Sequence, residues 1–413
     1  MTWLQQLLGF VSRKRVALHA EKHRWDGVYD EALVLATLAL CLLGVVMVFS
    51  ATVVLPDGPK YGNYSQYHFL IRHSAALLVG IVMGVVVFSV PTSFWHKIVL
   101  PALIAVVVML FAVVLFGKTV NNAQRWFSFG GFAVQPSEFA KLALVCYCAR
   151  YLDTVKQRAA LDFSKMMPIV LVLGGVLALI MMQPDLGTSV VIAMTVLLIL
   201  FLGNARLEFF LAMMGMLLVA VLIIIVYYPW RLERFKVVFD PWNEAYAQGA
   251  AYQLTHSLIA FGRGGYFGQG LGQSVEKLFY LPEMHTDFIP AIVAEELGLV
   301  GFLVVLGLLA FVIVRAFKIA QNAIDLDRAF CAHLARGVGL VFLIQVVISF
   351  FMNLGMLPTK GLTLPFISYG GSSLVTMVAA VAILLRIDFE NRQLMHGGAG
   401  RSASSVSRSR GGK

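Results

Sequence analysis

Residues 281–288 place an acid, a histidine and a hydroxyl directly before a long apolar run. Glu283, His285, Thr286 and Asp287 lie close together in this segment. An ionisable group at the edge of a membrane is costly, so it is a candidate for function. A carboxylate in such a place could accept a proton from a substrate hydroxyl. We therefore take Asp287 as the first candidate for a catalytic residue.

Other polar side chains lie beside apolar runs in several segments of the chain. The candidates for substrate binding are Arg125, Gln135, Glu138, Lys141, Asp185, Lys277, Glu283, His285, Lys360 and Ser368. Such a mixture of acids and bases next to lipid suits a substrate with a phosphate-bearing head and an apolar tail. The cations would hold the phosphates, and a carboxylate would move a proton.

Several acidic residues also have a plain structural explanation. Glu138 and Lys141 are three apart, so they share one helix face and could form a buried ion pair that only joins helices. Asp185 could be an ordinary turn residue. Glu295 and Glu296 lie deeper along the helix that follows Asp287. Because adjacent residues cannot both face one cavity, we expect this last pair to be structural.

The histidines and cysteines do not indicate a metal site or a disulfide framework. His256 and His285 have no second ligand at zinc spacing, so no metal ligand is assigned. No cofactor is indicated with certainty, although the acids could hold a divalent cation, Mg or Mn, beside a leaving phosphate. The cysteines are isolated or two apart on a helix, at positions 41, 146, 148 and 331.

The composition places these polar groups in a membrane protein. Hydrophobic residues make up 59% of the 413 residues and charged residues 13%, whereas a soluble domain carries about 25% charged residues. Runs of about 20 apolar residues cross a bilayer. We expect ten spans, at 32–54, 70–90, 97–117, 135–151, 167–183, 188–203, 208–228, 287–317, 333–355 and 370–387. The fourth, fifth and sixth are short or contain polar residues. The predicted fold class is all-α, a polytopic membrane protein of about ten transmembrane helices.

The distribution of positive charge predicts the orientation of the bundle. With ten spans both termini lie on one side, and most of the 32 Lys and Arg residues fall in the termini and loops of that side. Positive residues favour the cytoplasm, so we expect cytoplasmic termini and place Asp287 at the outer face. The net charge of +10 is spread over many short loops, which indicates topology and not a nucleic-acid partner.

The chain is expected to divide into three parts. Residues 1–30 form a cytoplasmic segment, residues 31–388 the membrane domain, and residues 389–413 a tail. The tail ends in Gly, Ser and Arg residues, so we expect it to be disordered. The extracytoplasmic loop between helices seven and eight, residues 229–286, is long enough to suggest a functional role.

Several blocks of the sequence resemble the SEDS family of cell-wall glycosyltransferases. They are Arg125-Trp-Phe with Gln135-Pro-Ser-Glu-Phe-Ala-Lys141, Gln183-Pro-Asp-Leu-Gly-Thr188, and Pro282-Glu-Met-His-Thr-Asp-Phe with Ala-Glu-Glu-Leu-Gly298. A further block, Leu357-Pro-Thr-Lys-Gly-Leu-Thr-Leu-Pro-Phe-Ile-Ser-Tyr-Gly-Gly-Ser-Ser373, is similar to the cell-division branch; the elongation branch usually differs at Thr-Lys-Gly. The resemblance spans nearly all ten expected helices. Pro290 departs from it, since Phe is commoner there, but proline is tolerated in the first turn of a helix.

The resemblance implies polymerisation of lipid II into peptidoglycan strands at the outer face of the cytoplasmic (inner) membrane, at the division septum. Asp287 matches the family's essential aspartate and would be the general base, with undecaprenyl pyrophosphate displaced with inversion. Its place at a helix N-terminus predicts that the dipole keeps it ionised; the alternative is that it only caps the helix. Lys141, Arg125, Lys360 and Lys277 would neutralise the leaving group.

The resemblance also implies partners, namely a class B penicillin-binding protein (a transpeptidase) and other membrane proteins of the division machinery. Two other functions stay open: a flippase for lipid II, and a non-enzymatic scaffold for the transpeptidase. Acids and bases gathered on one side favour chemistry over transport, because a carrier needs polar groups on both sides. A scaffold would not need Asp287.

Overall fold

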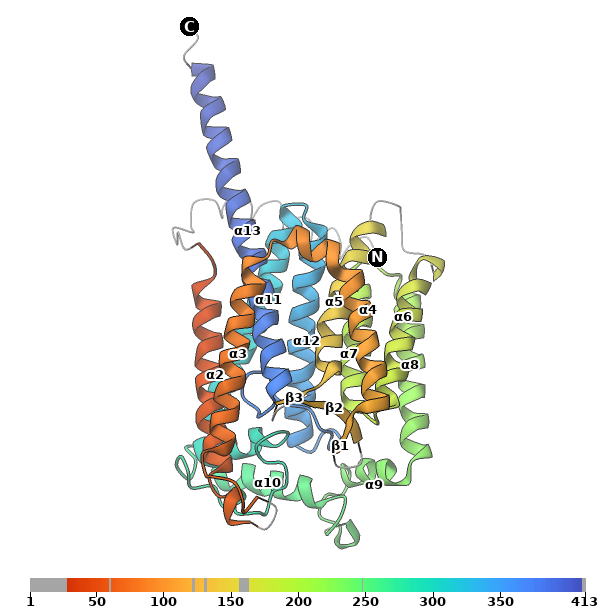
Figure 1. Ribbon diagram of the computed structural model, residues 1–413, viewed down its shortest axis with the longest axis vertical. Coiled ribbons are helices and arrows are strands. Elements are labelled where there is room, and N and C mark those ends of the chain that lie inside the picture. The colour runs from red at the N-terminus through yellow and green to blue at the C-terminus, as the bar shows by residue number, and fades with distance from the viewer. Residues whose placement is uncertain are drawn as a thin grey trace.

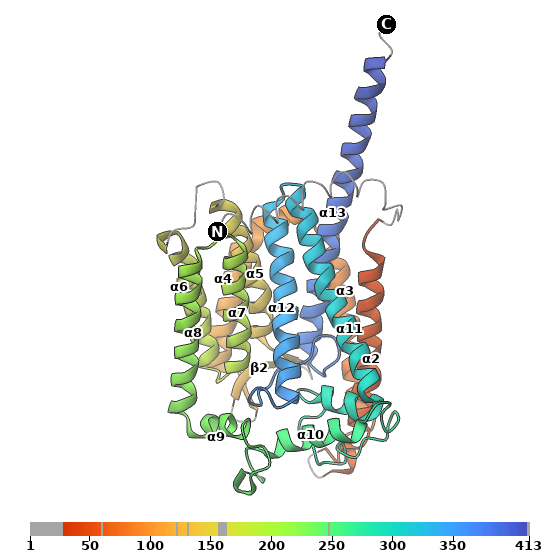
Figure 2. The same cartoon turned by 180° about the vertical axis from the view of Figure 1, so that it is seen from behind.

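The computed structural model describes residues 28–58, 61–120, 123–129, 132–155, 163–246 and 248–410, with side chains as far as His396. Most of the predicted N-terminal segment, residues 1–27, lies outside the described residues. Ten long helices stand side by side in the described part of the chain (Figures 1 and 2). They are α2 (Glu31–Thr52), α3 (His68–Ser89), α4 (Thr92–Phe116), α5 (Pro136–Val155), α6 (Phe163–Met181), α7 (Leu186–Leu202), α8 (Leu207–Tyr227), α11 (Ile289–Asp325), α12 (Ala329–Asn353) and α13 (Gly371–Arg410).

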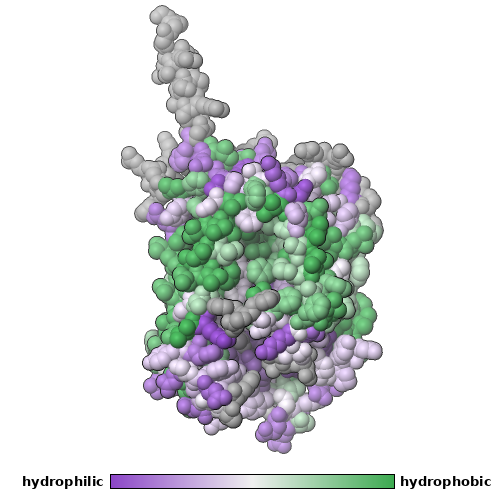
Figure 3. Space-filling view, viewed as in Figure 1, coloured by the Kyte–Doolittle hydropathy of each residue, from purple (hydrophilic) through white to green (hydrophobic). Residues whose placement is uncertain are grey.

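Each of the ten expected spans corresponds to one of these helices, so the predicted all-α class is confirmed. Seven of the helices are long and apolar enough to cross a membrane, and α6 and α7 contain shorter apolar stretches. The fourth of these helices, α5, carries Glu138, Lys141, Arg150 and Asp153, which lowers its hydropathy. Figure 3 shows that apolar side chains predominate across the middle of this face, between two hydrophilic ends. The chain is a multi-pass membrane protein.

One end of the bundle carries additional structure, and we call it the site end. Helices α9 (Pro229–Val237) and α10 (Tyr252–Gly264) lie across it, as Figures 1 and 2 show. A small antiparallel sheet of β1 (Lys118–Val120), β2 (Ala123–Phe129) and β3 (Phe132–Val134) lies there too. This sheet was not predicted from the sequence; β1 and β3 have only three residues each, and β2 packs against α4.

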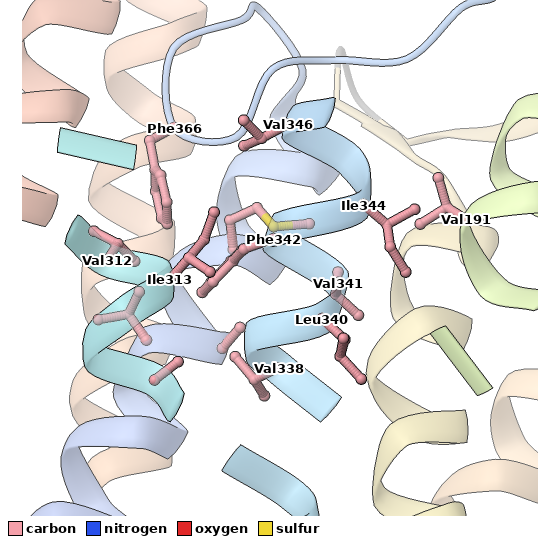
Figure 4. Packing of buried hydrophobic residues seen from close by; sticks show 14 of the residues in the cluster. Val191, Val312, Ile313, Val338, Leu340, Val341, Phe342, Ile344, Val346 and Phe366 are labelled. Atoms are coloured by element: carbon pink, nitrogen blue, oxygen red, sulfur yellow. The ribbon is translucent and has the colours of Figure 1, made fainter. Parts of the chain in front are cut away.

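The core is centred on α12, which packs against α5, α7 and α11. Figure 4 shows Val338, Val341 and Phe342 of this helix among apolar side chains of its neighbours. Phe366, from the segment between α12 and α13, stacks near Phe342 with ring centroids 5.4 Å apart. This segment therefore folds back into the core and does not extend into the surroundings.

Helix α11 is broken at Gly298, which has φ 67° and ψ −169°. Main-chain groups freed by a break at membrane depth need partners within the protein. The segment after α10 supplies them: Gln269 N donates to Glu295 O at 2.9 Å, and Leu299 N donates to Gly265 O at 2.9 Å. The long loop is thereby hydrogen-bonded into the eighth span.

The predicted boundary between membrane domain and tail, at residue 388, stays a prediction, and it falls inside a helix. Helix α13 continues to Arg410, and Glu390 and Asn391 bond to the bundle. Thr92 N, at the start of α4, donates to Glu390 Oε1 at 2.9 Å, and Arg328 Nη1 donates to Asn391 Oδ1 at 2.6 Å. These bonds hold the helix to the bundle beyond the apolar run.

Gly268 gives a test of this loop attachment. A β-carbon at Gly268 would lie 2.1 Å from Glu296 O, and the residue has φ +80°. We expect Gly268→Ala to destabilise the protein by about 2–4 kcal/mol through overlap and backbone strain. The measurement is the thermal unfolding midpoint in detergent.

The matched control is Gly262→Ala, because a β-carbon at Gly262 on α10 meets nothing within 4 Å. That substitution should leave the midpoint unchanged or slightly higher. Equal midpoints for the two variants would contradict the attachment.

Candidate active site

Asp287 lies in a tight turn just before α11. The backbone amides of Thr286, Asp287 and Phe288 all donate to Glu283 O, at 3.2, 3.2 and 3.3 Å. Phe288 occupies the N-cap position of α11, so Asp287 precedes the cap. The alternative that Asp287 merely caps the helix does not fit this geometry.

Two segments of the core hold this turn in place. Asn353 Nδ2, at the end of α12, donates to Asp287 O at 3.1 Å, and Tyr369 N donates to His285 O at 2.9 Å. On the other side, a β-carbon added at Gly361 would lie 3.2 Å from Asp287 Oδ2. The Asp287 carboxylate therefore lies against the segment between α12 and α13, and a side chain at position 361 would press on it.

The surroundings of Asp287 favour its protonated form. Burial, followed by the neighbouring carboxylate of Glu283, raises the pKa of Asp287 to about 8, while Arg125 and Arg234 act in the opposite direction. The expectation that the dipole of α11 keeps this carboxylate ionised is wrong. Its oxygens lie outside the capping position, so desolvation dominates.

Four cations surround this turn. Lys360, predicted from the sequence, is the residue before Gly361, and its ammonium lies 5.6 Å from the ring centre of Trp230. Burial, then the positive charges of Arg231, Arg234 and Arg125, lowers the pKa of Lys360 to about 8. Mutual repulsion of this kind indicates that the cations are close and under-neutralised.

Arg231 and Arg234 were not predicted from the sequence. Trp230 at the start of α9 gathers them: the Arg231 and Arg234 guanidinium carbons lie 4.9 and 5.6 Å from its ring centre. Arg231 is only 3% exposed, and its Nε and Nη1 atoms have no hydrogen-bond partner among the described residues. Burial lowers the pKa of Arg231. A Trp-Arg-x-x-Arg pattern opening the long loop was the available signal.

Arg125, on β2, is fixed by the segment between α6 and α7. Its Nε donates to Gln183 O at 3.0 Å and its Nη2 to Pro184 O at 2.6 Å. Its Nη1 lies 3.8 Å from Asp185 Oδ1. Asp185 also caps α7 by accepting from Thr188 N at 3.2 Å, so the predicted turn role and a place beside the cations are both present.

Gln135, another predicted residue, lies between β3 and α5 and bonds to side chains at the starts of three helices. Its side-chain amide nitrogen lies 3.0 Å from Ser137 Oγ and 3.4 Å from Asp185 Oδ2. Its backbone N–H donates to Ser372 Oγ at the start of α13. Gln135 therefore joins the start of α5 to α13 and to Asp185, the residue at the start of α7 that lies beside Arg125.

Lys141 and Glu138 form the buried ion pair that was the structural alternative. Lys141 Nζ lies 2.8 Å from Glu138 Oε2 and donates to Gln345 Oε1 at 2.9 Å. Gln345 Nε2 in turn donates to Thr363 O at 2.8 Å. Lys141 is 2% exposed. The pair therefore positions the segment that carries Lys360 and does not itself face the cations.

Lys277 is likewise used within the protein. Its Nζ donates to Glu296 Oε1 at 3.0 Å and to Gly272 O at 2.6 Å. Glu296 also accepts from Ser50 of α2 at 2.7 Å. Lys277 is 3% exposed, so the structure does not bring it to the group around Asp287.

Glu295 binds the same loop, accepting from Val275 N at 3.0 Å and from Ser274 Oγ. Both glutamates are structural, as predicted. The argument that adjacent side chains diverge was wrong here, since Glu296 also reaches Ser274 N. The break at Gly298 lies just beyond them, and the loop wraps around this part of α11.

The remaining predicted residues shape the loops around the turn. Glu283, with φ 54°, accepts from Thr286 Oγ1 at 3.2 Å. The His285 ring contacts those of Phe69 and Tyr369, with centroids 5.1 and 5.5 Å away. Ser368 Oγ accepts from Leu364 N at 2.7 Å. The last bond folds the segment between α12 and α13.

A polar stripe on α12 was also missed. Gln345, Ser349 and Asn353 are spaced four apart on one face, and each is fully buried. Spacing by four places side chains on one helix face, so the stripe could have been predicted from the sequence. It leads from the Lys141 ion pair to Asp287. Within the described residues, no group of three His, Cys, Asp or Glu side chains is arranged to hold a metal ion.

Comparison with known proteins identifies the fold and the family. Residues 31–393 match the family model of FtsW, RodA and SpoVE, described as cell cycle protein. The chain belongs to this family, the SEDS proteins. It is 47% identical over 375 residues to a probable peptidoglycan glycosyltransferase FtsW of Burkholderia thailandensis, covering 90% of this chain and 80% of that protein. It is 42% identical over 411 residues to the FtsW of Thiomonas intermedia bearing the same description, covering 96% of this chain and 99% of the relative.

Solved structures of SEDS proteins have the same fold. A chain of a peptidoglycan synthase complex, studied for the coordination of polymerization and crosslinking, aligns with TM-score 0.71 and 27% identity, over 88% of this chain and 99% of that one. The rod shape determining protein RodA of Thermus thermophilus aligns with TM-score 0.64 and 26% identity, over 89% and 99%. The resemblance seen in the sequence blocks is therefore confirmed, including its division branch.

The Lys141 pair gives a test of its structural role. We expect Lys141→Met to destabilise the protein by about 3–5 kcal/mol, because it leaves the buried Glu138 carboxylate unpaired. The double variant Lys141→Met/Glu138→Gln should recover much of that loss, since no buried charge remains. Thermal unfolding in detergent measures both; equal midpoints for the single and double variants would show that the pair is not coupled.

Proposed function

We propose that this chain is a peptidoglycan glycosyltransferase that polymerises lipid II into glycan strands during cell division. The observation that carries this is the juxtaposition of one proton-accepting carboxylate, Asp287, with Arg125, Arg231, Arg234 and Lys360. No ion pair joins Arg231, Arg234 or Lys360 to a carboxylate within the described part of the chain. A diphosphate is an anion that would satisfy such a group, and relatives described as glycosyltransferases support the choice.

The proposed reaction begins at the acceptor sugar. The ionised Asp287 carboxylate removes the proton from the acceptor GlcNAc 4-hydroxyl as its oxygen attacks the anomeric carbon of the donor MurNAc. The new glycosidic bond forms as the bond to undecaprenyl pyrophosphate breaks, with inversion. The proton stays on Asp287, and the diphosphate leaves with the electron pair of the broken bond.

The cations serve the leaving group. Arg231 presents two unpartnered donors, and Arg234 is oriented by donating to Thr359 O at 3.2 Å. Charge that develops on a diphosphate is best stabilised by donors fixed before the reaction. Helix α3 packs on α2 and α13, whereas α4 packs on α5 (Figure 1).

The positive charges on the loops support cytoplasmic termini, which would put the site end outside, at the septal membrane. A class B penicillin-binding protein is the proposed partner, since one structural relative is part of a synthase complex that couples polymerization and crosslinking. Other division membrane proteins would join this assembly. At the opposite end, Arg328, Arg386 and Arg315 pair with carboxylates. Transfer is favoured over transport because a carrier would not need a carboxylate, that of Asp287, placed to accept a proton.

Substitution of the base gives the main test. We expect Asp287→Asn to abolish polymerisation, lowering the rate by at least about 100-fold, because the amide cannot accept the proton. The full chain and its transpeptidase partner are purified together, labelled lipid II is added, and glycan strands are resolved on a gel. The control is Asp325→Asn, an exposed carboxylate at the opposite end.

The same assay has a defined pH dependence. Because the pKa of Asp287 is raised to about 8, the fraction ionised increases about tenfold from pH 7 to pH 9. The rate should rise with pH over this interval. A polymerising Asp287→Asn variant would rule out the general base, and a flat profile in the wild type would contradict the raised pKa.

The leaving-group site has a separate test. We expect Arg231→Met to lower kcat/KM for lipid II by about 100-fold, as removal of one preorganised donor does elsewhere. Arg231→Lys should not restore activity fully, because an ammonium lacks the planar donor fork. Arg336→Gln, near the opposite end, serves as the control. Equal kinetics of Arg231→Met and wild type would remove Arg231 from the site.

A further inference from the structure

The turn that carries Asp287 is held to the bundle by core packing of Met284 and Phe288 and by a small number of described hydrogen bonds. Its own amide bonds, from Thr286, Asp287 and Phe288, all end on Glu283 O within the turn. They define its shape but do not fix its position on the bundle. Of the two bonds described above that anchor it to the core, one uses the side chain of Asn353.

Asn353 is built to make this contact. It is fully buried at the end of α12, and its Nδ2 donates to Asp287 O at 3.1 Å and to Ser349 O at 2.8 Å. Both acceptors are carbonyl oxygens, so only the nitrogen of the amide can face them. An aspartate would turn a carboxylate toward two carbonyls, and a serine would be too short to span them.

The position of Asn353 is itself fixed from α10. Ser257, also fully buried, donates through Oγ to Asn353 O at 2.9 Å. That carbonyl belongs to the last turn of α12, where helix carbonyls lack partners of their own. Ser257, Asn353 and Asp287 therefore form a continuous line from α10, through the end of α12, to the proposed base.

We propose that Asn353 is a positioning residue for Asp287, and that Ser257 supports it. The inference rests on the proposed function only in taking Asp287 as the reacting group. Asn353 touches the backbone of Asp287, so it acts on where the carboxylate sits and how far it is desolvated. Glu283, Asp185, Arg125 and Arg234 are the charged groups that act on that carboxylate, and none of them is altered by changing Asn353.

A purely structural role predicts something different. If Asn353 only closed the end of α12, its loss would lower stability and leave the chemistry of Asp287 alone. If it positions Asp287, its loss releases the turn, admits water to the carboxylate and misplaces the base. Misplacement by about 1 Å can lower a rate by about 100-fold.

The experiment compares Asn353→Ala and Ser257→Ala with Asn391→Ala in the full chain with its partner. Asn391 is a fully buried asparagine at the opposite end, bonded to Arg328 and Ile319 O. It controls for loss of a buried amide. We expect Asn353→Ala to lower kcat about 10- to 100-fold with little change in KM. Ser257→Ala should lower kcat about 3- to 10-fold, as for one ordinary hydrogen bond. Asn391→Ala should affect the unfolding midpoint only.

A second readout does not depend on polymerisation. A carbodiimide with an amine nucleophile modifies carboxyl groups in their protonated form, and fragmentation mass spectrometry follows the label on Asp287 across pH, apart from that on Glu283 in the same peptide. In the wild type, labelling should persist to near pH 8. In Asn353→Ala it should end at lower pH, toward the ordinary range of an aspartate at about 4, and Asn391→Ala should match the wild type.

Each outcome is decisive. Loss of kcat together with the labelling shift supports positioning, and Ser257→Ala supplies the answer if Asn353→Ala does not fold. Kinetics and labelling of Asn353→Ala equal to those of Asn391→Ala overturn the proposal. If the wild type forms no polymer, the proposed function fails, and the labelling shift alone still decides whether Asn353 positions Asp287.

Discussion

Every charge and main-chain group at the depth of a membrane needs a partner from the protein, and this constraint organises the bundle. It is clearest where α11 breaks at Gly298. The loop after α10 pairs the freed main-chain groups, and Lys277 neutralises the Glu296 carboxylate in the same place. The long loop between α8 and α11 is therefore part of the membrane domain's packing. Its helix α10 packs against α11.

The group around Trp230 is the exception to this constraint. Arg231 is buried with two unpartnered donors, and Lys360 has its pKa lowered to about 8 by burial and neighbouring cations. Such an arrangement is unfavourable on its own, because desolvated cations repel each other. It is stable as part of a fold whose remaining charges are neutralised, and it becomes favourable when an anion enters. The cations whose repulsion is unfavourable are therefore the same groups that are proposed to bind the diphosphate.

The helices were predictable because hydropathy over about 20 residues is a strong local signal. All ten spans were found, including the polar α5, whose Glu138 and Lys141 form an internal pair. The three-stranded sheet was not found, because its strands are set by contacts with α4 and α13 and not by a pattern of their own. Helix α13 continues past the predicted boundary at residue 388, where Glu390 and Asn391 bond to Thr92 and Arg328.

The residue types of the candidate site were predictable from the sequence, but the interaction partner of each residue was not. Lys141, Lys277 and Lys360 look alike in the sequence. In the structure Lys141 forms an ion pair with Glu138 and Lys277 with Glu296, whereas Lys360 lies among other cations. Which cation is neutralised depends on partners far away along the chain, and no local pattern records them. The same reason explains the failed dipole argument for Asp287. The sequence placed Asp287 near a helix start. Only the fold decides that Phe288 occupies the N-cap position and that burial raises the pKa of Asp287.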